Sequence, residues 1–346
     1  MEKIIKDTIN EWLENRGEEF SGVVSASGEN GVIVSHATGY RNKAEELPNT
    51  PETVFGIASG TKLFTGLAIC KLIDEKKLSL GDKLWDLLSY DLGEIDKGVT
   101  VHQLLTHSSG VGDYIDEESD DVEEDLQKLY DTYPVQLWDN LKYYLQMITP
   151  LKPKFKPGER YGYSNSGYVL LGLVVEAVSG VSYHEFVREN IIKKAGLTRT
   201  DFYPANALPY NAALGYMPGD EPDDTWRTNI FSIGIMGGSD GGIFSCAGDF
   251  DKLWRAIFAH KIMSKEMTEL FLKSHVEIKD EKTYGLGVYH LTEEGGTVHF
   301  VVGGDSGVGF LSAYYPKVRV VVSAFSNIGW INGTYGLIGD VLGVLE

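Results

Sequence analysis

Apolar residues at the start of the chain recur at the spacing of one helix face. Ile4, Ile5, Ile9, Trp12 and Leu13 follow this spacing within "MEKIIKDTINEWLENRGEEF". Residues three or four positions apart share one side of an α-helix. The pattern therefore predicts an amphipathic N-terminal helix.

Two later segments also carry helical patterns. Leu63, Leu67 and Cys70 repeat at helical spacing in "TKLFTGLAICKLIDEKKL", and residues 166–180 form a longer apolar run. Gly180 ends that run, and glycine readily takes the left-handed conformation that closes many helices. The chain between residues 59 and about 230 is predicted to be mostly helices and long loops.

Short apolar runs near both ends predict β-strands. Two such runs within residues 21–39 flank Glu29-Asn30-Gly31, which indicates a β-hairpin. Near the C-terminus we expect strands in "YGLGVYHL", "TVHFVV", "GFLSAYY" and "VRVVVSAFS", with turns at residues 293–296 and 316–317. Turns this short join antiparallel neighbours. The last segment, "GTYGLIGDVLGVLE", is expected to be a helix packed on the sheet.

Strands at both ends with helices between them predict an α+β fold. An antiparallel β-sheet flanked by terminal helices would carry an inserted all-helical lobe. Residues 1–58 and 236–346 would form a discontinuous sheet domain, and residues 59–235 the helical lobe. The active site is expected between the two.

Composition and net charge limit the classes of partner and the cellular location that we expect. The net charge of −19 over 346 residues repels nucleic acid, so we expect no nucleic-acid partner. Cys70 and Cys246 are too few and too far apart for a disulfide framework, so buried thiols are expected. No window reaches the roughly 18 apolar residues of a membrane span. With no signal peptide, the chain as written is expected to be cytoplasmic, or extracytoplasmic if a leader was removed.

Residues 113–125, "DYIDEESDDVEED", contain nine acidic side chains. A solvated, mobile loop that shapes the substrate pocket is the expected structure. A calcium site is the alternative, although the EF-hand spacing and its glycine are missing. His102 and His107 stand five residues apart, a poor spacing for a helical metal pair, and a structural hydrogen-bonding role is expected for His107. The sequence predicts no metal site and no cofactor.

Two serines are candidates for a nucleophile. Ser306 lies in Gly304-Asp305-Ser306-Gly307, an order found around the nucleophile of trypsin-like proteases. That chemistry needs an earlier His and Asp within β-barrel domains, which a helical middle region contradicts. The glycines around Ser306 are better explained as a strand that a ligand or another backbone approaches closely.

Ser59 and Lys62 stand three residues apart at the start of a predicted helix. That spacing places both side chains on one helix face. A desolvated lysine loses its proton more readily and can then accept one from serine. The spacing is common by chance, however, and Ser59 could instead be a helix cap with Lys62 a solvated first-turn residue.

Tyr163-Ser164-Asn165 precedes the long apolar helix. Tyr-x-Asn is also common by chance, and Tyr40-Arg41-Asn42 is a second copy. A loop tyrosine followed by a helix cap would be the structural explanation. Tyr163 is preferred over Tyr40 because it enters the helical lobe through a Pro-Gly loop.

Together these segments resemble the serine β-lactamase and penicillin-binding protein superfamily. The resemblance is to the branch of class C β-lactamases, DD-peptidases and related esterases, and it extends over nearly the whole chain. Its segments are "VFGIASGTKLFTGLAICKLIDEKKLSLGDKL", "VTVHQLLTHSSGVGDY", "FKPGERYGYSNSGYVLLGLVVEAVSGVSYHEFV" and "GIMGGSDGGIFSCAGDFDKL", in this order.

The resemblance implies a role for each of these residues. Ser59 would be the acylated nucleophile, and Lys62 and Tyr163 would share the general-base work. Asn165 would hold Lys62 and touch the substrate amide. The oxyanion hole would combine the backbone N–H of Ser59 with one from a later strand.

That strand would carry the family's third motif, usually Lys or His, any residue, then Gly. Here the matching positions are Val301-Val302-Gly303, and Gly304 would supply the second oxyanion N–H. The cation is absent, and the nearby His299 is not expected to replace it. We therefore expect a cofactor-independent serine hydrolase for ester, amide or β-lactam bonds in a small-molecule or peptide substrate. The alternative is a penicillin-binding sensor that acylates but turns over poorly.

Overall fold

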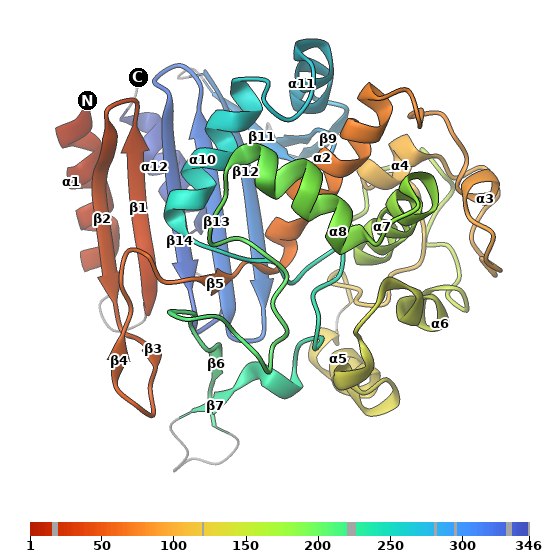
Figure 1. The fold of residues 1–346 in the computed structure, drawn as a ribbon, viewed down its shortest axis with the longest axis horizontal. Helices are drawn as coiled ribbons and strands as arrows, with labels where there is room; N and C mark the ends of the chain where they lie inside the picture. The colour runs from red at the N-terminus through yellow and green to blue at the C-terminus, as the bar shows by residue number, and fades with distance from the viewer. Residues whose placement is uncertain are drawn as a thin grey trace.

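One eight-stranded antiparallel sheet, at the left of Figure 1, organises the chain. The computed structural model describes residues 1–15, 20–119, 121–219, 226–279, 282–293, 296–329 and 334–344. The strand order is β2 (Gly31–Thr38), β1 (Gly22–Gly28), β14 (Val320–Ser326), β13 (Val308–Tyr315), β12 (Gly296–Asp305), β11 (Tyr289–Glu293), β10 (Lys282–Tyr284) and β9 (Val276–Lys279). The N-terminal hairpin pairs with the last strand, so both ends of the chain build the same sheet.

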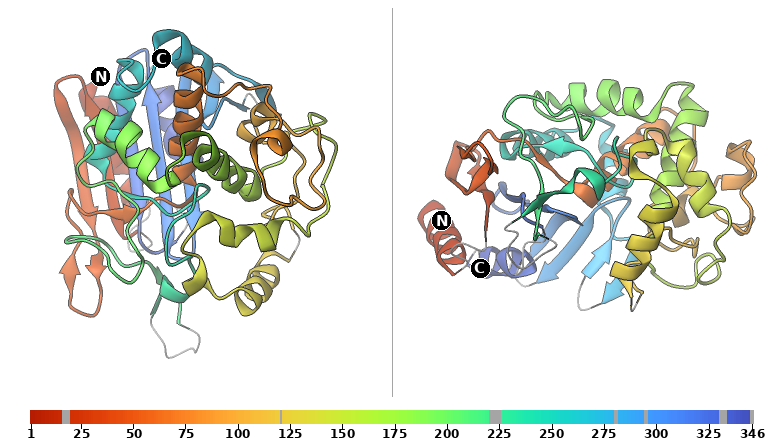
Figure 2. Two further views of the ribbon diagram at one scale, coloured as in Figure 1. Left: turned by 45° about the vertical axis from the view of Figure 1, so that its right-hand side comes forward. Right: turned by 90° about the horizontal axis from the view of Figure 1, so that it is seen from below.

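Helices α1 (Glu2–Glu14) and α12 (Thr334–Gly343) lie side by side on one face of the sheet (Figure 2). Ile5, Ile9 and Trp12 of α1 share a buried core with the sheet and α12. Ile4 was expected on the same face, but 48% of it is exposed. The helix turns by about 100° per residue, which directs Ile4 away from the face that Ile5 and Ile9 occupy.

The opposite face of the sheet is covered by α2 (Thr61–Asp74), α10 (Ala247–Phe258) and α11 (Lys265–Leu272). Beyond them, at the right of Figure 1, lie α3 (Leu84–Leu87), α4 (Val101–Leu105), α5 (Val122–Thr132), α6 (Leu145–Ile148) and α7 (Asn165–Ser179). Helix α8 (Tyr183–Val187), nearer the centre of the view, contacts α2, and α9 (Lys193–Ala195) contacts α10. The α+β fold with an inserted helical lobe is therefore confirmed, while the two-domain division stays a prediction.

Three short two-stranded ladders lie outside the main sheet. They pair β3 (Tyr40–Asn42) with β4 (Leu47–Pro48), β5 (Phe55–Gly56) with β8 (Phe244–Ser245), and β6 (Tyr216–Met217) with β7 (Arg227–Thr228). The β5–β8 pair fixes the chain just before Ser59.

One expected strand is wrong. "YGLGVYHL" is not continuous, since β10 ends at Tyr284 and β11 begins at Tyr289. The residues between them form a turn, with Gly287 at φ +115°. This turn packs against α2 so closely that a Cβ on Gly66 would lie 2.1 Å from the carbonyl oxygen of Leu286. Packing on the helix therefore replaces strand pairing here.

Other local predictions are confirmed. Gly28 pairs with Gly31 across the first hairpin, and Gly180 closes α7 at φ +78°. Glu294 and Gly295, the centre of one predicted turn, lie outside the described residues. Cys70 and Cys246 are free and buried. Among the described helices none alone has the length and apolar composition to cross a membrane, although α7 with residues 183–195 would qualify as a pair bent by 80°.

Candidate active site

Ser59 and Lys62 meet at the start of α2. Ser59 lies in the 3₁₀ turn η2 (Ala58–Gly60), which leads directly into the helix. The Lys62 side chain points inward, since only 3% of the residue is exposed. Its Nζ lies 2.9 Å from Ser59 Oγ. Lys62 is therefore not a solvated first-turn residue.

Two further groups hold the Lys62 ammonium. Nζ donates to Asn165 Oδ1 at 2.7 Å and to the backbone carbonyl of Asp240 at 2.8 Å. Both partners are oxygen acceptors with no proton to give. A neutral Lys62 would donate its two N–H groups to these two oxygens. Its lone pair would then face the third neighbour, Ser59 Oγ.

Tyr163 reaches Ser59 from the loop before α7. Its Oη donates to Ser59 Oγ at 2.8 Å, although the two residues are 104 apart in sequence. Ser164 caps α7 by accepting from the backbone N–H of Gly167, which fixes the loop. The second Tyr-x-Asn copy lies elsewhere, with Tyr40 on β3.

His107 contacts the loop that carries Tyr163 and Ser164. Its Nδ1 accepts from the backbone N–H of Ser164 at 3.1 Å, and its ring lies 4.5 Å from that of Tyr163. The predicted hydrogen-bonding role of His107 is thus confirmed. His102 pairs instead with His275 at 3.1 Å. Within the described ranges, no group of three or more His, Cys, Asp or Glu residues could hold a metal ion.

Asp113, which the sequence predicts to lie in a solvated loop, contacts the candidate active site. Its carboxylate accepts from the backbone N–H groups of Asn165 and Ser166 at 2.9 and 2.8 Å, at the N-terminus of α7. Burial raises the pKa of Asp113 to about 7, and these two hydrogen bonds at the helix N-terminus oppose that rise. The only available sequence signal was an acidic residue 52 positions before a predicted helix start, which no local pattern connects to it.

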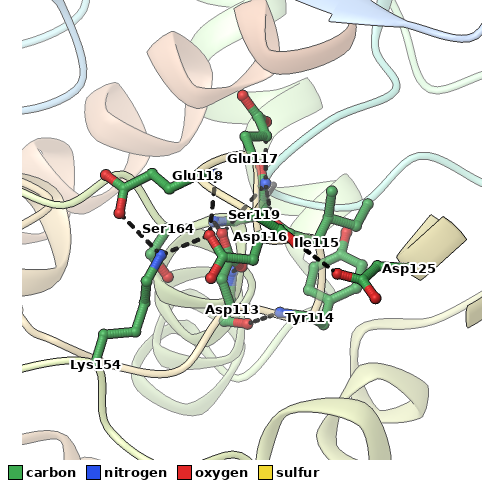
Figure 3. A network of polar contacts seen from close by, with 12 residues as sticks. Asp113, Tyr114, Ile115, Asp116, Glu117, Glu118, Ser119, Asp125, Lys154 and Ser164 are labelled. Carbon is green, nitrogen blue, oxygen red and sulfur yellow. Dashed lines mark hydrogen bonds and ion pairs between the residues drawn. The ribbon is translucent and has the colours of Figure 1, made fainter. Parts of the chain in front are cut away.

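The rest of the acidic segment also contacts the site and the neighbouring loop. Asn165 Nδ2 faces three acceptors, on Asp113, Ile115 and Glu117, at 3.3 to 3.4 Å. Lys154 forms ion pairs with two residues of the segment (Figure 3), with Nζ 2.7 Å from Asp116 and 3.3 Å from Glu118. The segment then enters α5. The predicted loop is confirmed, and Glu117 and Glu118 are exposed, but the segment also contacts Asn165 and Lys154.

Gly303 lies against the turn that carries Ser59. A Cβ at this position would lie 2.1 Å from the carbonyl oxygen of Ile57, and 2.9 and 3.0 Å from the backbone nitrogens of Gly60 and Ser59. Only glycine permits this approach. Gly304, the next residue, lines the same cavity as Ser59.

Val301 and Val302 of the third motif do not line the cavity. Val301 is 4% exposed within the core, and Val302 packs towards the terminal helices. His299 pairs with His290, Nδ1 to Nδ1 at 2.8 Å, and is not brought to Ser59. Ser306 sits in the turn between β12 and β13 and lines the same cavity as Ser59, and its carbonyl accepts from Asn229.

The surroundings shift the proton affinities of the site. Burial lowers the pKa of Lys62, while the carboxylates of Asp240, Glu117, Asp113 and Asp305 oppose that change. Burial raises the pKa of Tyr163 well above its usual value, and nearby Glu117 adds to this. Tyr163 therefore holds its proton, whereas Lys62 gives up its own more easily than a solvated lysine.

A cavity of about 280 Å³ opens in front of Ser59. Asn165, Asp240 and Gly304 line it together with Ser59, and so do several aromatic side chains, including Tyr114, Trp138 and Tyr144. This volume suits a small molecule or part of a peptide. The arrangement offers a nucleophile, a candidate base, a proton donor and space for an acyl group.

Known proteins share this architecture. A family model described as Beta-lactamase matches residues 9–329. Penicillin-binding protein 4* of Bacillus subtilis (strain 168) is 29% identical over 331 residues, covering 91% of this chain and 70% of that protein. The crystal structure of a penicillin binding protein from Bacillus halodurans gives a TM-score of 0.87 at 37% identity, covering 98% of this chain and 99% of that chain.

The octameric penicillin-binding protein homologue from Pyrococcus abyssi gives a TM-score of 0.81 at 28% identity, covering 99% of this chain and 76% of that chain. The resemblance noted from the sequence is thereby confirmed over nearly the full length. The chain belongs to the β-lactamase family and has the fold of the serine β-lactamase and penicillin-binding protein superfamily.

Proposed function

We propose that this protein is a serine hydrolase that cleaves ester, amide or β-lactam bonds through an acyl-enzyme on Ser59. The observation that carries the proposal is the convergence of Lys62 Nζ and Tyr163 Oη on Ser59 Oγ, at 2.9 and 2.8 Å. These distances lie within hydrogen-bond reach, which proton transfer requires. The relatives named as penicillin-binding proteins support a β-lactam among the acyl donors.

Lys62 is the better candidate for the base. Its pKa is lowered by burial, and its other two contacts are acceptors that direct the lone pair of the neutral amine at Ser59. Tyr163 is the better proton donor, because its raised pKa keeps the phenol protonated. The two residues would thus divide the proton transfers between them.

Acylation would proceed as follows. The Ser59 proton passes to Lys62 Nζ while Oγ forms a bond to the substrate carbonyl carbon. Backbone N–H groups of Ser59 and Gly304 would stabilise the oxyanion. As the bond to the leaving group breaks, Tyr163 gives that group its proton and regains one from Lys62. Water then attacks the acyl-enzyme by the reverse sequence of transfers.

Intact-mass labelling tests this assignment. A fluorophosphonate should add one label to the wild type and to Ser306→Ala, but none to Ser59→Ala. A labelled peptide that contains Ser306 would refute the assignment of Ser59. The same experiment with a penicillin shows whether a β-lactam is accepted.

Burst kinetics with a chromogenic ester separate an enzyme from a sensor. An enzyme continues after the first equivalent of product, whereas an acylating sensor releases one equivalent and stops. A single stoichiometric burst would therefore keep Ser59 as the acylated residue and reject hydrolysis.

A further inference from the structure

The cavity in front of Ser59 has a strongly unbalanced charge. Its described lining contains the carboxylates of Glu117, Asp240 and Asp305, and it contains no Lys, Arg or His. Lys62, which contacts Ser59 but does not line the cavity, has its ammonium held by Ser59, Asn165 and the backbone of Asp240. A substrate carboxylate would therefore meet like charges and no free cation.

The three carboxylates also act on one another. Desolvation raises the pKa of Asp305 to about 7, and repulsion from Asp240 and Glu117 adds to the rise. Repulsion of this kind would be relieved by a positive charge placed among the carboxylates.

Aromatic rings supply a second, independent feature of the same cavity. Tyr114, Trp138 and Tyr144 line it, and their ring centroids lie 5.4 to 6.1 Å apart. Tyr114 Oη donates to Asp240 Oδ2 at 2.5 Å, which joins the rings to the acidic wall. Aromatic faces attract ammonium groups and bury apolar chains, whereas the negative face of a ring does not attract a carboxylate.

We infer that this cavity selects acyl donors that carry a free ammonium group over donors that carry a carboxylate. The inference rests on the proposed function, because it concerns the substrate of Ser59. Glu117 and Asp305 would be the specificity-determining residues, and the aromatic wall would hold the chain that bears the ammonium.

Three p-nitrophenyl esters of equal chain length test the inference at low salt and pH 8. They are the 6-aminohexanoate, the heptanoate and the pimelate monoester, whose chains end in an ammonium, a methyl and a carboxylate. We expect kcat/KM to fall by about tenfold at each step, which corresponds to about 1.4 kcal/mol. Added salt should reduce the differences, because it screens charges.

Variants locate the source of the preference. Glu117→Gln and Asp305→Asn should each lower the ratio of kcat/KM for the ammonium ester to that for the methyl ester by about threefold or more. Glu118→Gln is the matched control: it removes the same unit of charge from a residue that pairs with Lys154 and does not line the cavity. Its ratio should equal that of the wild type.

Two results would overturn the inference. One is a carboxylate ester cleaved as fast as the ammonium ester, and the other is a ratio that neither cavity variant changes. If the heptanoate is hydrolysed at Ser59 in either case, the proposed function survives and only the charge preference is wrong. If no ester is cleaved and Ser59 is not labelled, the proposed function itself fails.

Discussion

Replacing Gly303 by alanine should separate the strand that carries it from the nucleophile turn. The new Cβ would lie 2.1 Å from the carbonyl oxygen of Ile57, whereas a close carbon–oxygen contact is about 3.3 Å. The two backbones must therefore move apart by roughly 1 Å. The partner turn has no slack of its own, since a Cβ on Gly60 would lie 2.4 Å from the Phe310 ring.

The movement falls on the proposed oxyanion site, which lies between Ser59 and Gly304. A displacement of 1 Å at a reacting centre can cost about 10²-fold in rate. Overpacking of this kind also lowers the free energy of unfolding by about 1–3 kcal/mol. We therefore expect Gly303→Ala to fold with a lower Tm and to lose about 10²-fold in kcat/KM for a neutral ester.

Steady-state hydrolysis of p-nitrophenyl butyrate, with thermal melts on the same samples, measures both effects. Gly248→Ala is the matched control, because nothing lies within 4 Å of its Cβ position in α10. Alanine is the better helix former, so the control should keep full activity and gain up to about 1 kcal/mol. Wild-type kcat/KM and Tm in Gly303→Ala would refute the close approach of β12 to Ser59.

Three more predictions concern the base, the substrate and the response to pH. Lys62→Ala or Tyr163→Phe should lower the rate of acylation by about 10²-fold or more, while Tyr40→Phe should change it little. Stopped-flow labelling measures this rate, and an unchanged rate in Tyr163→Phe would exclude the phenol from proton transfer. A short neutral ester such as p-nitrophenyl butyrate should have a higher kcat/KM than benzylpenicillin, and the reverse order would mean that an unrecognised group binds the carboxylate. Burial holds the pKa values of His290 and His299 at about 4 and about 3, below the usual 6.5. The unfolded chain then binds more protons at these two residues between these values and 6.5, so their contribution to stability should fall as the pH drops through this window. Asp305, whose folded pKa is raised, contributes in the opposite direction over part of the same window. His299→Gln should show a shallower fall in Tm over this window, and an unchanged slope would reject the assignment.

Periodicity predicted the outline of the fold well. The terminal helices, the first hairpin and α7 with its closing Gly180 follow from apolar spacing and glycine positions that act locally. Errors arose where distant packing decides the outcome. The turn after Tyr284 packs closely against Gly66 of α2. The eight residues "YGLGVYHL" alone do not encode that contact.

The residues of the candidate site also fall into two groups, those that a local sequence pattern indicates and those that only the fold brings together. Ser59 with Lys62, and Tyr163 with Asn165, could be named because each pair is close in sequence. Asp113 could not, since its role depends on α7 starting beside it, 52 residues later.

Glu117 and Asp305 are a second case of this kind. Each looks like an ordinary surface acid in the sequence, and only the fold brings both into the lining of one cavity. Their effect on substrate choice therefore has no local signature.

The contacts of Lys62 make catalysis a measure of complete folding. Its ammonium is held by residues 103 and 178 positions further along the chain, and β12, which bears Gly303, belongs to a sheet built from both ends of the chain. A fragment, or a partly unfolded state in which any one of these segments has detached, would leave Ser59 without a neighbour it needs. The fraction of molecules that a fluorophosphonate labels should therefore report the native fraction directly, and it should decline no later than the sheet signal during unfolding.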